Sequence, residues 1–508
     1  MIRIALAALL SFWASYARAQ LEFKKGDRIL LYGNSFVERL QEDGRFEASL
    51  QLAHPDKDLQ FRSLAWTGDE VGYRLRPERY VNHLKKLLDQ WPANVVILGF
   101  GLNESFAGEK GLTKFRADLT GYLKEIERRH PDARVILLSP IATEDLKHPH
   151  YPDPQKRNAE TKQYLEVISK VATERKVGFV DLHTPSKEAY ARHDAPLTEN
   201  GIHLNDAGHQ WVAAHLAREL LGEAAFAKVK PSRAAEVAKA VSRKAGYVAT
   251  IVRPVNTVLY FGVRGRANEY NADMPRYHAL VAKADAVTHA LCKDTKLAFD
   301  ATPLTLEPLV KKEPVALPSP AEMLRSFQVA DGYKVNLFAS EKEFPELRNP
   351  EQIAFDARGR LWVVTMPSFP STIPGDVPHD KIIVLEDTDH DGKADKSTIF
   401  ADQLNVPDGL AFYKDGVIIS HQPRLVFMKD TTGDGKADLS REIMRGIDVT
   451  DAHHGGMIAM GPMGNVMFCD GVFTVHNWRL LMASREAWMP LPTASTCARV
   501  PWSVNTKL

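Results

Sequence analysis

The chain has few cysteines, almost no excess of charge and few long apolar runs, and each shortage excludes a class of protein. Three cysteines in 508 residues, Cys292, Cys469 and Cys497, give neither a disulfide framework nor a metal-ligand spacing. The 65 Lys+Arg and 64 Asp+Glu leave a net charge of +1, so we expect no nucleic-acid partner and no anionic membrane surface. Past the amino terminus no apolar stretch is long enough to cross a bilayer. We therefore expect no stable membrane span, and the 44% of hydrophobic and 25% of charged residues are ordinary for soluble domains.

The amino terminus has the pattern of a signal peptide. Arg3 precedes an apolar stretch that ends at Ala17-Arg18-Ala19, the small-x-small arrangement that signal peptidase accepts. Residues 1–19 are thus predicted to be cleaved, which indicates a periplasmic or secreted protein. An uncleaved anchor is the alternative.

Residues 20–222 alternate between strand-like and helix-like segments. The apolar runs are RILLYG, LQFRSLAW, NVVILGFG, ARVILLSP and VGFVDLH. Each run is nearly continuous, as in strands that are covered on both faces. Five such strands with helical crossovers predict a three-layer α/β/α sandwich around a five-stranded parallel sheet. Active sites of such sheets form at the carboxyl ends of the strands.

Four residues suited to acyl transfer follow these runs. Ser35 comes after the first run, Gly68 after the second, Asn103 after the third and His203 after the fifth. Together they offer a nucleophile, a backbone N–H, an amide donor for an oxyanion and a base. Taken singly, each has a simpler structural role. Ser35, for example, could be a helix N-cap worth about 1 kcal/mol. Their order along the chain favours the functional interpretation.

The blocks GNS, TGD, GLNE and NGIH resemble those of the SGNH/GDSL hydrolase family, in the family's order. The resemblance implies that Ser35 attacks an ester carbonyl and that His203 takes its proton. It also implies that the N–H groups of Ser35 and Gly68 and the amide of Asn103 bind the oxyanion. Hydrolysis would need no cofactor, and the expected substrate is a small ester or an O-acylated, for example acetylated, carbohydrate.

One position departs from the family pattern in a way that bears on catalysis. The family's acid stands three residues before the histidine, and here that residue is Asn200. An asparagine can orient an imidazole but cannot stabilise its positive charge. The neighbouring Glu199 would need an unusual backbone to take over. The alternative to a hydrolase is therefore a catalytically impaired SGNH protein that only binds its ligand.

The rest of the chain divides into three further segments. Residues 223–316 are predicted to be a helical extension followed by a proline-rich linker. Residues 317–480 contain short strands and a repeated acidic turn about 40–45 residues apart, which predicts about three blades of an incomplete all-β propeller. Residues 481–508 have neither pattern and suggest an irregular, frameshifted tail.

The propeller segment resembles bacterial membrane-bound dehydrogenase-like proteins, which are related to quinoprotein sugar dehydrogenases. The resemblance places His453 at the position of a catalytic base beside pyrroloquinoline quinone. A propeller needs at least four blades, so we do not expect the quinone to bind. The remnant of a quinone-dependent dehydrogenase is a further alternative for the function.

The first acidic turn has the spacing of a calcium loop. DTDHDGKAD offers Asp387, Asp389, Asp391 and Asp395 as oxygen ligands at alternating positions. The second copy has Thr432 where the first has Asp389. Calcium is thus predicted at the first turn rather than at the second, and plain solvated hairpins are the alternative.

Overall fold

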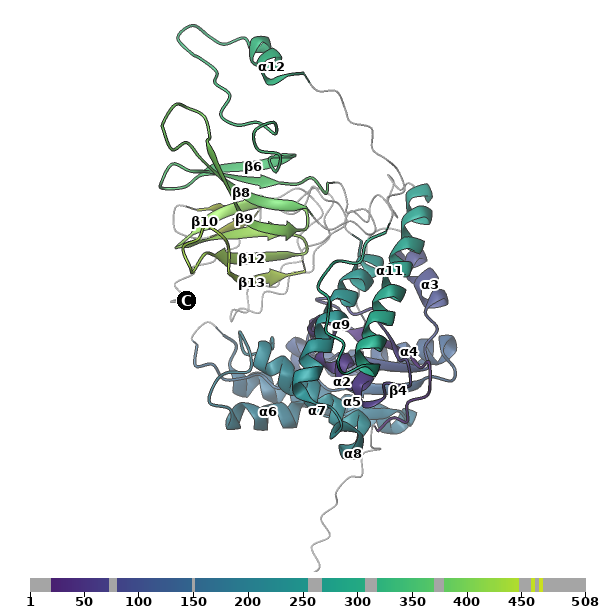
Figure 1. Ribbon diagram of the computed structural model, residues 1–508. Coiled ribbons are helices and arrows are strands. Elements are labelled where there is room, and N and C mark those ends of the chain that lie inside the picture. Colours follow the sequence, from purple (N-terminus) through teal and green to yellow (C-terminus); the bar gives the residue numbers. More distant parts are fainter. Residues whose placement is uncertain are drawn as a thin grey trace, which may run out of the picture.

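The structure is a computed structural model, and Figure 1 shows its arrangement. The described residues are 20–72, 80–148, 151–254, 267–306, 318–369, 379–446, 458–461 and 466–468. The predicted signal peptide, His453 and the tail from 481 lie outside these residues and stay predictions.

The amino-terminal domain is built on one parallel sheet of five strands in the order β2-β1-β3-β4-β5. The strands are β1 Arg28–Gly33, β2 Gln60–Ser63, β3 Val95–Gly99, β4 Arg134–Leu138 and β5 Gly178–Val180. Each lies within one of the five apolar runs, which confirms the predicted sheet. The connecting helices are α1 Ser35–Asp43, α2 Arg45–Ala53, α3 Tyr80–Gln90, the 3₁₀ helix η1 Glu104–Gly111, α4 Leu112–Arg129, α5 Pro154–Arg175, α6 His183–Arg192 and α7 Asp206–Leu221.

Both faces of the sheet are buried, which explains why its strands are apolar at every position. Successive residues of β1 point to opposite faces, as a pleated strand requires. Ile29 and Leu31 pack with α1, α2 and α7, whereas Leu30 and Tyr32 pack with α4 and α5. The α/β/α layering follows from these two cores.

The helical extension shares the core of this domain. It consists of α8 Glu223–Phe226, α9 Pro231–Val252 and α11 Ala267–Lys293, and Figure 1 shows α9 and α11 side by side. Val248 and Ile251 of α9 and Leu280 of α11 belong to the same apolar cluster as Leu30 of the sheet. Because α9 also packs on α1, α2 and the edge strand β2, the extension contacts both helical layers. None of the described helices is long and apolar enough to cross a membrane.

The carboxyl-terminal part is all-β after the short helix α12 Pro320–Ser326. Its first sheet contains β6 Pro350–Phe355, β7 Leu361–Thr365, β8 Asp380–Glu386 and β9 Lys396–Leu404. Its second contains β10 Pro407–Tyr413, β11 Gly416–His421, β12 Arg424–Lys429 and β13 Leu439–Arg445. A third pair joins β14 Ile458–Met460 to β15 Val466–Phe468.

Both four-stranded sheets are antiparallel meanders with the strands in chain order, and they appear in green in Figure 1. The predicted short strands are therefore present. The propeller is not shown, because the described residues form two four-stranded sheets and one pair, whereas a propeller needs at least four such sheets around a channel.

Candidate active site

Ser35 stands where β1 turns into α1. A side chain on the preceding Gly33 would place its Cβ 2.4 Å from Val37 Cγ2 and 2.6 Å from the Gly99 carbonyl oxygen. Only glycine permits so close an approach of helix and strand. The sharp turn leaves Ser35 as the first residue of α1, partly exposed at the end of the sheet.

The helix cap that Ser35 could have provided is supplied by Asn34. The Asn34 side-chain oxygen accepts the Phe36 N–H at 3.1 Å, and Asn34 itself is buried. Within the described part of the chain, no group hydrogen-bonds to the Ser35 hydroxyl. The Ser35 N–H belongs to the first turn of α1, where N–H groups lack helical acceptors and the helix dipole favours negative charge. It is suited to an oxyanion.

The segments of Gly68 and Asn103 meet at the same edge of the sheet. Gly68 follows β2 in a turn with φ +82°, a conformation that favours glycine. Asn103 directly precedes η1, and its side-chain amide donates to the Asp69 carbonyl at 3.0 Å. Trp66 N–H donates to the Gly33 carbonyl at 3.0 Å, which ties the Gly68 turn to the segment of Ser35.

Glu104 joins the Gly68 segment to the Asn103 segment, the two oxyanion segments, by hydrogen bonds. Its carboxylate accepts the N–H of Val71 and the N–H of Gly101, each at 2.8 Å. Burial raises the pKa of Glu104 to about 7, against the effect of these two hydrogen bonds. Glu104 lies in the GLNE block, but the sequence did not predict a role for it. Its signal was an acidic residue beside the amide donor, at the start of a buried turn.

His203 lies in a loop that Asn200 organises. The Glu199 N–H donates to the His203 carbonyl at 2.8 Å and closes the loop. The Asn200 side-chain oxygen accepts the N–H of Ile202 at 3.3 Å and the N–H of His203 at 3.0 Å. The Asn200 amide nitrogen then lies 3.0 Å from Nδ1 of His203.

This arrangement determines the tautomer of His203. Two backbone donors fix the Asn200 oxygen, so its NH₂ group must face Nδ1, and an NH₂ group can only donate. Nδ1 is therefore the acceptor, and the proton of the neutral ring sits on Nε2. A base that accepts a serine proton at Nε2 needs the other tautomer.

The His203 ring is held neutral. Burial lowers the pKa of His203 to about 3, and the positive charge of Arg39 acts in the same direction. A neutral imidazole can accept a proton, but so low a pKa makes it a weak base at neutral pH.

Arg39 connects the histidine loop to the serine helix. It lies on α1 one turn after Ser35, and its Nη1 is 3.9 Å from Oε2 of Glu199. Glu199 thus has its carboxylate toward Arg39 while Asn200 contacts the imidazole. The ring is oriented by an amide and not by a carboxylate.

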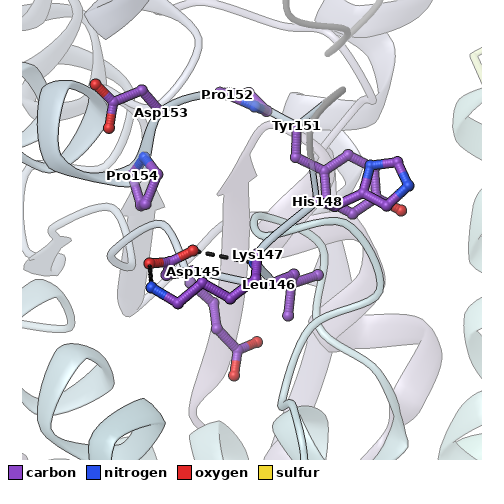
Figure 2. Close-up of a pocket in the computed structure, with 9 residues that line it drawn as sticks. Asp145, Leu146, Lys147, His148, Tyr151, Pro152, Asp153 and Pro154 are labelled. Atoms are coloured by element: carbon purple, nitrogen blue, oxygen red, sulfur yellow. Dashed lines mark hydrogen bonds and ion pairs between the residues drawn. The ribbon is translucent and has the colours of Figure 1, made fainter.

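A pocket of about 290 Å³ opens beside the same loop, lined by residues 144–148 and 151–154. Figure 2 shows its lining, with His148 and Tyr151 side by side at a ring-centroid distance of 4.3 Å. The Glu144 carboxylate accepts the N–H of Thr198 at 2.8 Å, and the Tyr151 hydroxyl donates to the Glu199 carbonyl at 3.4 Å. The pocket wall and the histidine loop are therefore one hydrogen-bonded unit.

The acidic turns lie in the carboxyl-terminal sheets, away from these residues in the sequence. Asp387, Asp389 and Asp395 each have an oxygen within 4.8 Å of the other two, whereas Asp391 is not part of this group. The Asp391 carboxylate accepts the Lys393 N–H at 2.8 Å. In the second turn, Asp430 accepts the N–H groups of its own loop. Calcium at the first turn stays a prediction.

Comparison with known families separates the two halves of the chain. Residues 31–211 match the GDSL-like Lipase/Acylhydrolase family. We refer to this region as the GDSL-like domain. Residues 319–471, which include both four-stranded sheets, match a domain of unknown function, DUF7133. The propeller and the dehydrogenase resemblance therefore stay predictions, whereas the resemblance to acylhydrolases is confirmed.

Solved structures resemble the GDSL-like domain at low identity. A gut microbial diltiazem-metabolizing enzyme is 21% identical over 40% of this chain and 49% of its own length, with a TM-score of 0.31. An acetylxylan esterase from Geobacillus stearothermophilus is 18% identical over 40% and 97%, at 0.30. A putative GDSL-like lipase from Parabacteroides merdae is 17% identical over 40% and 99%, at 0.32. This chain thus spans about half of the first protein. Among curated proteins, none gives a significant match.

Proposed function

We propose that the GDSL-like domain hydrolyses small esters, with Ser35 as nucleophile and His203 as base. The observation that carries the proposal is the assembly of the four sequence blocks at one sheet edge. Ser35 begins a helix there, the Gly68 and Asn103 segments are hydrogen-bonded to each other, and the Arg39–Glu199 contact brings the histidine loop to the serine helix. Hydrolysis by these groups needs no cofactor.

In the proposed reaction Ser35 Oγ attacks the ester carbonyl, and the carbonyl oxygen becomes an oxyanion. The N–H groups of Ser35 and Gly68 and the Asn103 amide are the donors that we assign to it. His203 takes the serine proton and later passes it to the leaving alcohol. Water then attacks the acyl-enzyme with the same base, releasing acid and Ser35.

Asn200 makes this hydrolase slow. To accept the serine proton at Nε2, the ring must first adopt the tautomer with a proton on Nδ1, which then faces the NH₂ group of Asn200. In serine proteases the corresponding Asp-to-Asn change lowers kcat about 10⁴-fold through the same wrong tautomer. We expect turnover well below that of a site with a carboxylate at this position.

The substrate class that we propose is an O-acylated carbohydrate or another small ester. Support comes from the pocket beside the histidine loop, which offers Asp145, Lys147, His148 and Tyr151 to a polar alcohol. A pocket of about 290 Å³ is at the lower end of those that bind small molecules. An acetyl group on a short oligosaccharide fits the chemistry better than a long acyl chain.

The deciding experiment restores the carboxylate. Asn200→Asp should raise kcat on a small acetyl ester by about 10²–10⁴, because the new oxygen accepts Nδ1–H and stabilises the imidazolium. Ser35→Ala should reduce turnover to background. Asn205→Asp is the matched control: it adds the same charge two residues after His203, at the N-cap of α7. There Asp accepts the Gly208 N–H as Asn does and loses only the donation of the amide to the Pro196 carbonyl. That variant should leave kcat unchanged.

A non-catalytic, ligand-binding protein is the second candidate, and the amide facing Nδ1 favours it. It predicts equal background turnover in the wild type, Asn200→Asp and Ser35→Ala across several acyl esters. That result would end the proposal of an enzyme. Titration calorimetry with an acetylated xylo-oligosaccharide would then show whether the pocket still binds it.

A further inference from the structure

The last strand of the second β sheet lies against the helix that carries Ser35. Arg39 Nη2 is 2.5 Å from Glu442 Oε1, and Arg445 Nη1 is 2.6 Å from Glu42 Oε2. Arg39 and Glu42 are on α1, and Glu442 and Arg445 are on β13. Two reciprocal ion pairs therefore join segments that are 403 residues apart.

The contact falls on the face of α1 that begins with Ser35. Arg39 and Glu42 follow Ser35 by four and seven residues, the spacing of one face of a helix. The strand that covers Arg39 and Glu42 hence continues the surface on which the nucleophile lies.

Two other segments of the active site lie near the same strand end, one in direct contact with it and one through Arg39. Gly446, directly after β13, lies so close to Thr67 that a Cβ on it would be 3.1 Å from Thr67 Cγ2. Thr67 precedes Gly68 of the oxyanion segment. Arg39 also contacts Glu199, which precedes Asn200. Parts of all three segments thus border the end of β13.

The ionic groups are largely withdrawn from water and balance one another. The side chains of Arg39, Glu442 and Arg445 are 14%, 14% and 8% exposed. Burial alone would raise the pKa of Glu442, but Arg445 and Arg39 lower it to about 2. Arg424 on β12 adds weaker contacts, 3.7 Å to Glu42 and 3.6 Å to Glu442. Glu442 is therefore charged at any ordinary pH, and its removal leaves buried arginines without their partner.

We propose that β13 forms one wall of the ester site and limits the size of the molecules that reach Ser35. The Arg39–Glu442 and Glu42–Arg445 pairs hold it there. That the substrate is an ester rests on the proposed function, whereas the limited access to position 35 does not. The carboxyl-terminal sheets thereby determine which substrates the GDSL-like domain can take.

The test measures access without requiring catalysis. Ser35→Cys in the full chain provides a thiol, which is labelled with a small methanethiosulfonate and with a bulky polymer-linked maleimide. The chain with Ser35 intact gives the background from the three native cysteines. Cys292, which is buried, also reports unfolding: its labelling increases only if the domain opens.

Reversing one charge should expose position 35 to the bulky reagent. In Glu442→Arg the maleimide rate should increase about tenfold relative to the small reagent, the change that 1.4 kcal/mol produces in the docking equilibrium. Glu442→Gln should increase the rate less, because the arginines around position 442 lose their partner but meet no added positive charge. Glu351→Arg, the same change on the exposed strand β6, should have no effect.

Equal ratios of bulky to small labelling in Glu442→Arg and Glu351→Arg would overturn the proposal. So would a Glu442→Gln variant that labels as slowly as the chain with Glu442 intact. If Cys292 becomes labelled in Glu442→Arg, the same comparison is made with Glu442→Gln, which removes the charge without reversing it.

A second experiment measures ester hydrolysis in the Asn200→Asp variant, with an acetylated monosaccharide and an acetylated oligosaccharide as substrates. Glu442→Arg should raise kcat/KM for the larger ester relative to the smaller one. An unchanged ratio, with thiol access increased, would overturn the role in substrate selection. No hydrolysis in any variant would refute the proposed function. The labelling of the Ser35→Cys thiol would still show whether β13 limits access to position 35.

Discussion

The GDSL-like domain meets its two neighbours through interfaces of opposite character. The helical extension joins it by a continuous apolar core and a buried ion cluster, in which Lys244, with 0% side-chain exposure, contacts Glu47 and Asp285. The second β sheet joins it through the largely buried ion pairs of Arg39 and Arg445 rather than through an apolar core.

The difference indicates which contact can open. An apolar core is lost only when the domain unfolds. An interface of charged groups can part without unfolding, because the charges regain water and counterions when they separate. The extension is thus an integral layer of the domain, and the sheets are a separable part. The following predictions test this contrast.

Removing the buried cation should have the largest effect. Lys244→Ala leaves Glu47 buried without its cation, whereas Asp285 keeps Arg62 at 2.7 Å. We expect a loss of about 3–5 kcal/mol in the free energy of unfolding. Urea denaturation measures it. Lys239→Ala, at an exposed position of the same helix, should change stability by less than about 0.5 kcal/mol. Equal effects would show that the Lys244 cluster is not a buried network.

The pH dependence of stability should have the next largest effect, because His203 lies beside the interface with the second β sheet. The pKa of folded His203 is about 3, so between pH 6.5 and 3 only the unfolded chain takes up its proton. The free energy of unfolding should therefore fall as the pH decreases, by up to about 1.4 kcal/mol per pH unit. Glu104, whose pKa is raised to about 7, acts in the opposite sense, so the difference from a His203→Gln variant is measured. Parallel curves would contradict the lowered pKa.

Salt should affect only the second interface. Raising the ionic strength from about 0.1 M to 1 M shortens the Debye length from about 10 Å to 3 Å. Labelling of the Ser35→Cys thiol by the bulky reagent should increase a few-fold over this range, while labelling of Cys292 should not change. A rate independent of salt would indicate that the sheet is held by apolar contacts.

Calcium should give the smallest effect, confined to the β sheets. If Asp387, Asp389 and Asp395 bind the ion, a chelator should lower the Tm of the carboxyl-terminal part by about 2–4 °C, and added calcium should restore it. Asp389→Asn should abolish the response, whereas Asp434→Asn in the second turn should retain it. An unchanged Tm would make both turns plain hairpins.

The sequence predicted the parts of the molecule that depend on local patterns. The five strands were found because a strand buried on both faces is a continuous apolar run, and the four blocks because each is short. Asn200 was recognised as a departure, but its effect on the tautomer depends on which way its amide faces, and that is decided by the N–H groups of Ile202 and His203.

What the sequence did not predict depends on contacts between distant residues. Arg39 and Glu442 look like ordinary surface charges, and no periodicity connects them. Glu104 has its role only because β2 and β3 end at the same edge. The number of blades was also beyond local patterns, since a repeated turn identifies a sheet but not whether sheets close into a ring.

The separation of 403 residues between Arg39 and Glu442 has a consequence for synthesis. About 150 of these residues follow the end of α11 at Lys293, and at about 5–20 residues per second the ribosome needs about 7–30 s to add them. The GDSL-like domain and its extension can fold within this interval, because folding of domains is generally faster. Every newly made molecule then has an uncovered Ser35 before β13 exists, so the nascent chain passes through a state in which β13 does not yet cover the site.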